Sequence, residues 1–174
     1  NSYRIFTVLT LAAVPPLCGF MGTTQIGWQV GFQGTVRLTQ QSAGLMAILT
    51  YFALLVGFYA IVWLIHWMSI TYGDKQPLPR CITLAIYAAS PLFLLGLVTL
   101  YPLLWLNMIL GIPALAYSVY LLYSGLPIMF DTTKERGFLF STAVLGVGLV
   151  SIVTLMAATV VLWGFGFGPE YVAD

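Results

Sequence analysis

The sequence predicts an all-α, polytopic membrane protein: one bundle of five transmembrane helices with proline kinks and a cytoplasmic N-terminus. The chain has 174 residues, of which 6% are charged, and its mean hydropathy is +0.98. Three long segments, residues 43–72, 81–130 and 137–168, contain no Lys, Arg, Asp or Glu. About 20 apolar residues suffice to cross the hydrocarbon core as a helix, the form in which a backbone satisfies its own hydrogen bonds. We therefore expect residues 1–174 to form a single five-span membrane domain.

We place the first span at residues 5–22 and the second at residues 43–72. Pro15 and Pro16 lie in the first span and predict a bend or a break, because proline lacks the backbone N–H that a helix interior needs. The second span is longer than a bilayer requires, so we expect it to tilt or to extend past the headgroups.

The segment between these spans, residues 23–42, is the longest polar interval, and we expect it on the extracytoplasmic side. Its apolar residues alternate with Gln and Gly, a period of two that is typical of a strand or an interfacial segment. The alternating apolar residues are Ile26, Trp28, Val30 and Phe32. A short hairpin or re-entrant cap and a plain loop both remain open.

The third and fourth spans contain proline near their middle. Residues 73–80 combine charges with helix breakers and predict a turn before the third span. The third span is placed at residues 81–101 and the fourth at residues 103–126. Pro91 and Pro113 each interrupt the hydrogen-bond ladder, so we expect both to face protein, where neighbouring groups can satisfy the freed carbonyls.

The fifth span is placed at residues 138–163, after the polar loop 131–136. We expect Pro127 to end the fourth span before this loop, because proline does not continue a helix. A tail rich in glycine and aromatic residues follows the fifth span.

The basic residues predict the orientation of the chain. With five spans, the N-terminus shares a side with the second-to-third and fourth-to-fifth connections. Five basic residues fall on that side: Arg4, Lys75, Arg80, Lys134 and Arg136. Arg37 alone falls on the other side. Short loops rich in Lys and Arg stay in the cytoplasm, so we expect a cytoplasmic N-terminus and an extracytoplasmic C-terminus.

The sequence offers little catalytic or metal-binding chemistry. The predicted spans hold no charge, and intramembrane charge usually marks a proton or ion pathway. A single histidine excludes bis-histidine haem ligation within one chain, and one His with two Cys is too few for a structural zinc site. We name no nucleophile–base pair. We therefore expect a non-enzymatic protein without a cofactor, a metal or a nucleic-acid partner.

His66 is the one histidine, and it lies between Trp63 and Trp67 near the predicted cytoplasmic end of the second span. Indole rings favour the membrane–water interface. We prefer an interfacial histidine that bonds headgroups or water over a gating or catalytic histidine.

A second group of residues is a candidate for lining a pathway or for packing helices. These are polar, aromatic and proline residues of the third and fourth spans: Tyr87, Ser90, Pro91, Asn107, Pro113, Tyr117 and Tyr120. A pathway needs a continuous polar cavity, or a pore between copies of the chain. A scaffold can instead be tightly packed throughout.

The predicted cytoplasmic turns carry charges of both signs. The residues are Asp74, Lys75 and Arg80 in one turn, and Asp131, Lys134, Glu135 and Arg136 in the other. Topology and contact with anionic headgroups account for the basic residues. Neither explanation accounts for Asp131 and Glu135. These acidic residues favour a docking surface, because charges of both signs attract and orient a partner.

Several segments together carry a family resemblance. They are Tyr87-Ala-Ala-Ser-Pro91, Tyr101-Pro102-Leu-Leu-Trp105, Tyr117-Ser-Val-Tyr120-Leu-Leu-Tyr123-Ser-Gly-Leu-Pro127, Gly22-Thr-Thr-Gln-Ile-Gly-Trp28 and Leu162-Trp-Gly-Phe165. They resemble the Yip family of Ypt/Rab-interacting membrane proteins, in its bacterial inner-membrane branch. The resemblance implies a five-helix domain with a cytoplasmic N-terminus, in agreement with the charge distribution.

Eukaryotic Yip proteins act in vesicle traffic by binding prenylated Rab GTPases and partner Yip proteins. Their recruiting region with its acidic-aromatic motif is not visible in this sequence, and a bacterium lacks Rab-driven traffic. The resemblance therefore carries over the fold but not this role. Our leading hypothesis is a scaffold or adaptor of the inner membrane, with lipid, other membrane proteins or a second copy as partners. The alternative is a small-solute or ion pathway, formed by one chain or by an oligomer.

Overall fold

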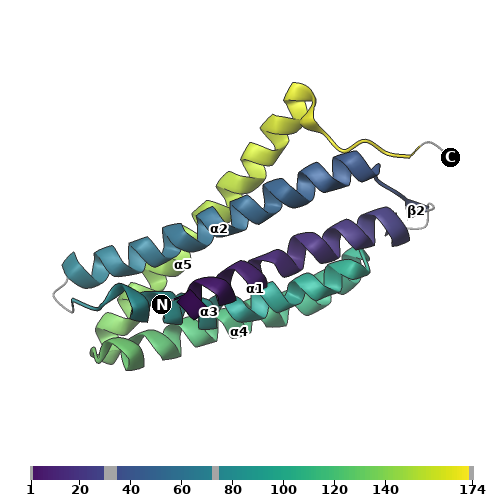
Figure 1. The fold of residues 1–174 in the computed structure, drawn as a ribbon. Coiled ribbons are helices and arrows are strands. Elements are labelled where there is room, and N and C mark those ends of the chain that lie inside the picture. The colour runs from purple at the N-terminus through teal and green to yellow at the C-terminus, as the bar shows by residue number, and fades with distance from the viewer. Residues whose placement is uncertain (1, 30–34, 72–74, 173–174) are drawn as a thin grey trace.

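The computed structural model describes residues 2–29, 35–71 and 75–172 (Figure 1). Its long helices are α1 Ser2–Met21, α2 Gln40–Thr71, α3 Leu78–Leu95, α4 Leu104–Phe130 and α5 Lys134–Leu162. All five are long and apolar enough to cross a membrane. The all-α, five-helix fold class expected from the charge-free segments is confirmed.

Short helical turns extend three of these helices. A π-helical turn, η1 at Gly22–Ile26, continues α1, and a 3-10 turn, η2 at Gly96–Leu100, continues α3. A second π-helical turn, η3 at Trp163–Phe167, continues α5. The helical segments overlap all five expected spans.

One expectation about proline is wrong, because α4 continues past Pro127 to Phe130. α1 runs through Pro15 and Pro16 without a break, and a bend at these residues stays a prediction. A membrane helix tolerates proline because neighbouring helices and side chains can satisfy the freed backbone groups. Proline alone therefore does not mark the end of a span.

Glycine brings α1 into direct contact with η2. A Cβ atom on Gly96 would lie 2.6 Å from Cγ of Pro15, and one on Gly22 would overlap the carbonyl oxygen of Thr99. Thr99 also donates through Oγ1 to the carbonyl oxygen of Pro15 at 3.4 Å. Small residues at such points let membrane helices approach closely.

The segment between α1 and α2 contains a short hairpin. β1 (Trp28–Gln29) pairs with β2 (Thr35–Val36) in antiparallel register. Of the two possibilities that the sequence left open, the described residues therefore form the hairpin. Val30 and Phe32 of the alternating pattern lie outside the described residues.

The C-terminal tail pairs with the chain that follows β2. Leu38 forms an antiparallel bridge with Tyr171, and the amide of Thr39 donates to the carbonyl oxygen of Glu170 at 3.0 Å. The amide of Glu170 donates in turn to Oγ of Ser42 at 3.2 Å. The tail thus returns from the far end of α5 to the start of α2 (Figure 1).

The buried core receives side chains from all five helices. Its residues are Val8, Ala12, Phe58, Val62, Ile65, Met68, Cys81, Leu84, Ala85, Phe93, Leu122, Leu126, Phe130, Phe140 and Val144. The core is apolar, as expected for a bundle that packs by shape rather than by charge.

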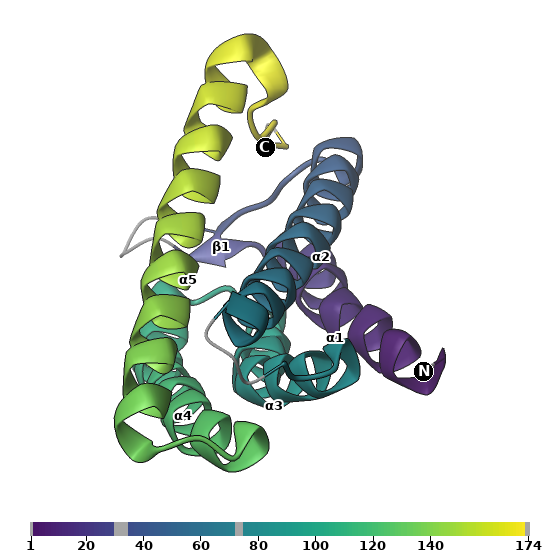
Figure 2. The same ribbon diagram turned by 90° about the vertical axis from the view of Figure 1, so that its left-hand side faces the viewer.

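α5 packs on the bundle only along its first half. Phe140, Ser141 and Val144 are buried, and no described residue of α5 beyond Val144 is buried. Figures 1 and 2 show that the helix crosses α2 and then diverges from it toward its C-terminal end. This exposed half can face lipid or another protein.

The loops separate into two ends of the bundle. The start of α1, the α2–α3 connection and the α4–α5 connection lie at one end (Figure 1). The hairpin and the C-terminal tail lie at the other end. This placement is the one that an odd number of spans requires.

Candidate functional site

The charged turns meet at one end of the bundle, where hydrogen bonds join them. Arg80 donates through Nη1 to Oε1 of Gln76 at 2.9 Å, and Gln76 donates through Nε2 to the carbonyl oxygen of Phe130 at 3.2 Å. Arg4 donates through Nη1 to the carbonyl oxygen of Pro79 at 2.7 Å. The start of α1, the α2–α3 turn and the end of α4 are therefore one connected surface.

Most of the expected docking residues are exposed on this surface. They are Lys75, Arg80, Asp131, Lys134, Glu135 and Arg136. These six residues, with Arg4 and Gln76, are called the charged end below. Asp74 lies outside the described residues. Among the residues that the structure describes, neither Asp131 nor Glu135 forms an ion pair.

A left-handed residue and a helix cap set the shape of the α4–α5 turn and so the positions of its charged residues. Asp131 ends α4 in the left-handed conformation with φ 49°, a common geometry at helix C-termini. Thr133 caps α5, because its Oγ1 accepts a hydrogen bond from the amide of Arg136 at 3.4 Å. Glu135 lies in the first turn of α5, where the helix dipole favours a negative charge.

His66 has a partner within the chain. Its Nδ1 lies 4.0 Å from Sγ of Cys81, across the α2–α3 hairpin. Cys81 is fully buried, and His66 is half-buried. A nucleophile and its base are expected within about 3.2 Å of each other and open to substrate. The pair therefore has the character of a packing contact, and a headgroup contact of His66 stays a prediction.

The candidate pathway tyrosines point away from the bundle. Tyr87, Tyr117 and Tyr120 are 63%, 55% and 64% exposed. The rings of Tyr117 and Tyr120 stack, with centroids 6.2 Å apart and an interplanar angle of 19°. Ser118 donates to the carbonyl oxygen of Ala88, so Tyr87 and Tyr117, their neighbours in the chain, lie at the same depth. The tyrosines thus lie on the outer surface of the α3–α4 pair.

The other polar candidates, Ser90 and Asn107, bond backbone carbonyl groups of their own helical segments. Ser90 donates through Oγ to the carbonyl oxygen of Ile86 at 2.6 Å. Asn107 donates through Nδ2 to the carbonyl oxygen of Leu103 at 2.9 Å, in the first turn of α4. These bonds support the local backbone and do not bring the two side chains together.

The two mid-span prolines differ in surroundings. Pro91 is half-buried in α3, whereas Pro113 is exposed on α4. Pro113 is therefore not buried within the single chain, and its contact with protein stays a prediction. Its ring is apolar, so contact with lipid carries no penalty.

Hydroxyl groups tie α3, α4 and α5 together. Ser118 of α4 bonds Ala88 of α3, and Ser141 of α5 donates through Oγ to the carbonyl oxygen of Leu122 at 3.4 Å. Both serines are buried. Interhelical bonds of this kind hold membrane helices in register.

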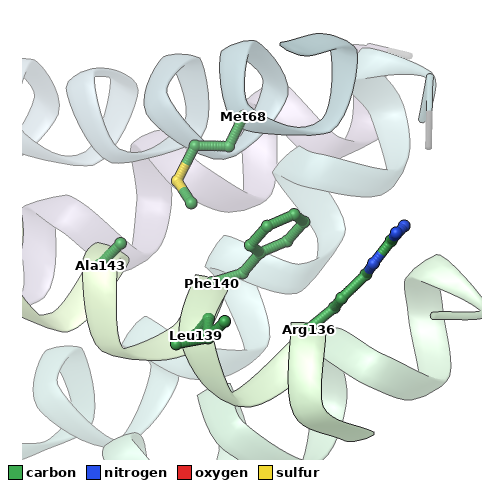
Figure 3. Close-up of a pocket in the computed structure, with 5 residues that line it drawn as sticks. All are labelled: Met68, Arg136, Leu139, Phe140 and Ala143. Atoms are coloured by element: carbon green, nitrogen blue, oxygen red, sulfur yellow. The ribbon is translucent and has the colours of Figure 1, made fainter. Parts of the chain in front are cut away.

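A hollow with a volume of about 340 Å³ lies between α2 and α5 near the charged end (Figure 3). Its lining residues are Met68, Arg136, Leu139, Phe140 and Ala143. Met68 points from α2 toward α5, and Arg136 extends from near the start of α5 on the other side of the Phe140 ring. Met68 and Phe140 are 7% and 6% exposed, so the floor of the hollow is apolar.

Sequence reasoning missed Gln76, Met68 and the contact between His66 and Cys81. The contact between His66 and Cys81 could have been found from the sequence. In an antiparallel helical hairpin, residues at similar distances from the turn lie side by side. The hollow has no such signal, because its lining residues come from distant parts of the chain. Among the described residues, no three His, Cys, Asp or Glu side chains are grouped to hold a metal ion.

Comparison with known proteins agrees with this architecture. The Yip1 domain family matches residues 2–155. The chain is 44% identical over 161 residues to the inner membrane protein YohC of Escherichia coli strain K12, an alignment that covers 92% of this chain and 82% of that protein. YohC of E. coli strain CFT073 matches with the same figures. No solved structure is a significant match. The chain belongs to the Yip1 domain family of membrane proteins.

Proposed function

We propose that this Yip-family protein is a non-enzymatic scaffold or adaptor of the bacterial inner membrane, with the charged end in the cytoplasm. The main support is that the α2–α3 and α4–α5 turns, which are far apart in sequence, form one exposed surface. Hydrogen bonds from Arg80 to Gln76 and from Gln76 to Phe130 join them. The distribution of basic residues and the inner-membrane location of the similar E. coli protein support the orientation and the compartment.

The charges of the charged end favour a role in binding a partner over a role in setting the membrane orientation alone. Asp131 and Glu135 are exposed beside Lys134 and Arg136, and neither acid has an ionic partner among the described residues. Acidic residues contribute little to membrane orientation. A partner with complementary charges would gain both attraction and register from this arrangement.

The exposed tyrosines support the helix-packing part of the proposal. Tyr117 and Tyr120 lie near the middle of α4 and face away from the bundle. Hydrocarbon chains accept no hydrogen bonds, so phenol groups at this depth gain from a neighbouring helix with polar groups. A second copy of the chain provides the same phenols as donors and acceptors.

The alternative of a solute pathway receives less support. The tyrosines proposed to line it lie on the outer surface, so they do not form a channel through a single chain. A pathway built on them would have to run between copies. Conductance of purified protein in liposomes would favour this alternative.

The test is to neutralise the two acids together, as Asp131→Asn and Glu135→Gln, and to crosslink the full chain in native membranes. We expect the variant to lose specific crosslinked partners while its expression and topology stay unchanged. Glu170→Gln is the matched control, because it removes an exposed acid at the opposite end. An unchanged set of partners would show that the turns are only connectors.

A further inference from the structure

The hollow between α2 and α5 combines an apolar floor with a cation at one end. Met68 and Phe140 form the floor, and Leu139 and Ala143 of α5 extend it. Arg136 is exposed and makes no ion pair with a described residue. An apolar surface that ends in a free guanidinium matches an amphiphile with an anionic head.

The depth of these residues matches a lipid. Arg136 lies just outside the start of the expected fifth span at residue 138, at headgroup level. Ala143 lies about two helical turns deeper along α5, a distance of roughly 10 Å. The hollow therefore runs from the headgroup level into the region of the upper acyl chain.

The surroundings of the hollow favour a lipid over other occupants. Beyond Val144, the described part of α5 has no buried residue, so an acyl chain can continue along exposed apolar helix. The described residues of the charged end include five basic and two acidic side chains, and this balance attracts anions. A soluble anion would be held by Arg136 alone and would bind weakly. A lipid would also bury its acyl chain on the apolar floor, which adds affinity.

We propose that this hollow binds an anionic phospholipid, with its phosphate on Arg136 and the upper part of one acyl chain against Met68 and Phe140. Arginine suits this role because its planar guanidinium can bond two phosphate oxygens at once. The site does not depend on the docking role of the charged end.

The experiment is native mass spectrometry of the full chain in detergent, with equal amounts of phosphatidylglycerol and phosphatidylcholine of the same acyl chains. We expect the wild-type chain to retain phosphatidylglycerol preferentially. Arg136→Gln should reduce that preference about tenfold, the loss expected when a hydrogen bond between two charged groups is removed. Lys134→Gln is the matched control: it removes a neighbouring exposed charge that does not line this hollow, and it should leave the preference near its wild-type value.

A second variant tests the hollow without changing charge. Ala143 is exposed, so Ala143→Phe should fold and fill the hollow, and it should reduce retention of phosphatidylglycerol. Equal losses in Arg136→Gln and Lys134→Gln would mean general attraction of anionic lipid and overturn the proposal. So would unchanged retention in Ala143→Phe. Competition by inorganic phosphate would assign the site to a soluble anion instead.

Discussion

At the residue scale, the exposed tyrosines of α4 are the most unusual feature of the membrane surface. A phenol near the bilayer centre has an apolar body that suits lipid and a hydroxyl that does not. Tyr117 and Tyr120 hold their rings parallel through stacking, so both hydroxyls are presented from one side of α4. This arrangement favours helix association through polar groups.

Replacing both residues, as Tyr117→Phe and Tyr120→Phe, should weaken self-association. The variant keeps both rings and removes only the hydroxyls, and interhelical hydrogen bonds contribute about 0.6 kcal/mol each on average. Two phenols in each of two copies form two to four such bonds, which predicts a loss of about 1–2.5 kcal/mol. Energy transfer between labelled copies in liposomes, at graded ratios of protein to lipid, measures it.

Tyr101→Phe is the control for this experiment. Tyr101 is 60% exposed but follows η2 at the end of its span, where water can bond its hydroxyl. We expect its self-association to equal that of the wild type. If the α4 variant also associates normally, the tyrosine surface faces lipid.

At the element scale, α5 is held at both ends but not in the middle. Its first half packs on α2 and α4, and its C-terminal tail pairs with the segment after β2. The intervening half is exposed. Sequence composition predicted the length of α5 but not which half packs on the bundle and which half is exposed. Residues that face lipid and residues that face protein are equally apolar in a membrane helix.

Removing residues 168–174 should release the tail without disturbing the bundle. The amide of Thr39 donates to Glu170, so it should exchange hydrogen faster in the truncated chain. The adjacent amide of Leu38 donates to the carbonyl oxygen of Thr23 and provides an internal control that should keep its protection. Hydrogen exchange followed at these two amides would contradict the pairing if Thr39 stayed equally protected.

Prolines and charges differed in how well they predicted the elements. Charge-free segments predicted where the chain crosses the membrane, because a charge inside the bilayer is costly whatever the packing. Proline misled at Pro127, because its effect depends on neighbours that the sequence does not place. The same limit concealed the link from Gln76 to Phe130, although the charges around it were visible in the sequence.

At the scale of the whole molecule, the fold gives the chain two different ends. One carries five basic residues with Asp131 and Glu135, and the other carries the hairpin, Arg37 and the tail. The scaffold proposal requires the charged end to face the cytoplasm, where soluble partners are available, and the excess of basic residues at this end suits the anionic cytoplasmic leaflet. Orientation is therefore the central claim.

Reporter fusions placed after Ser42, Gln76, Glu135 and Asp174 test this claim most directly. We expect cytoplasmic reporters after Gln76 and Glu135, and periplasmic reporters after Ser42 and Asp174, because five spans and the positive-inside rule allow only this order. A cytoplasmic reporter at Asp174, or a periplasmic one at Glu135, would contradict it.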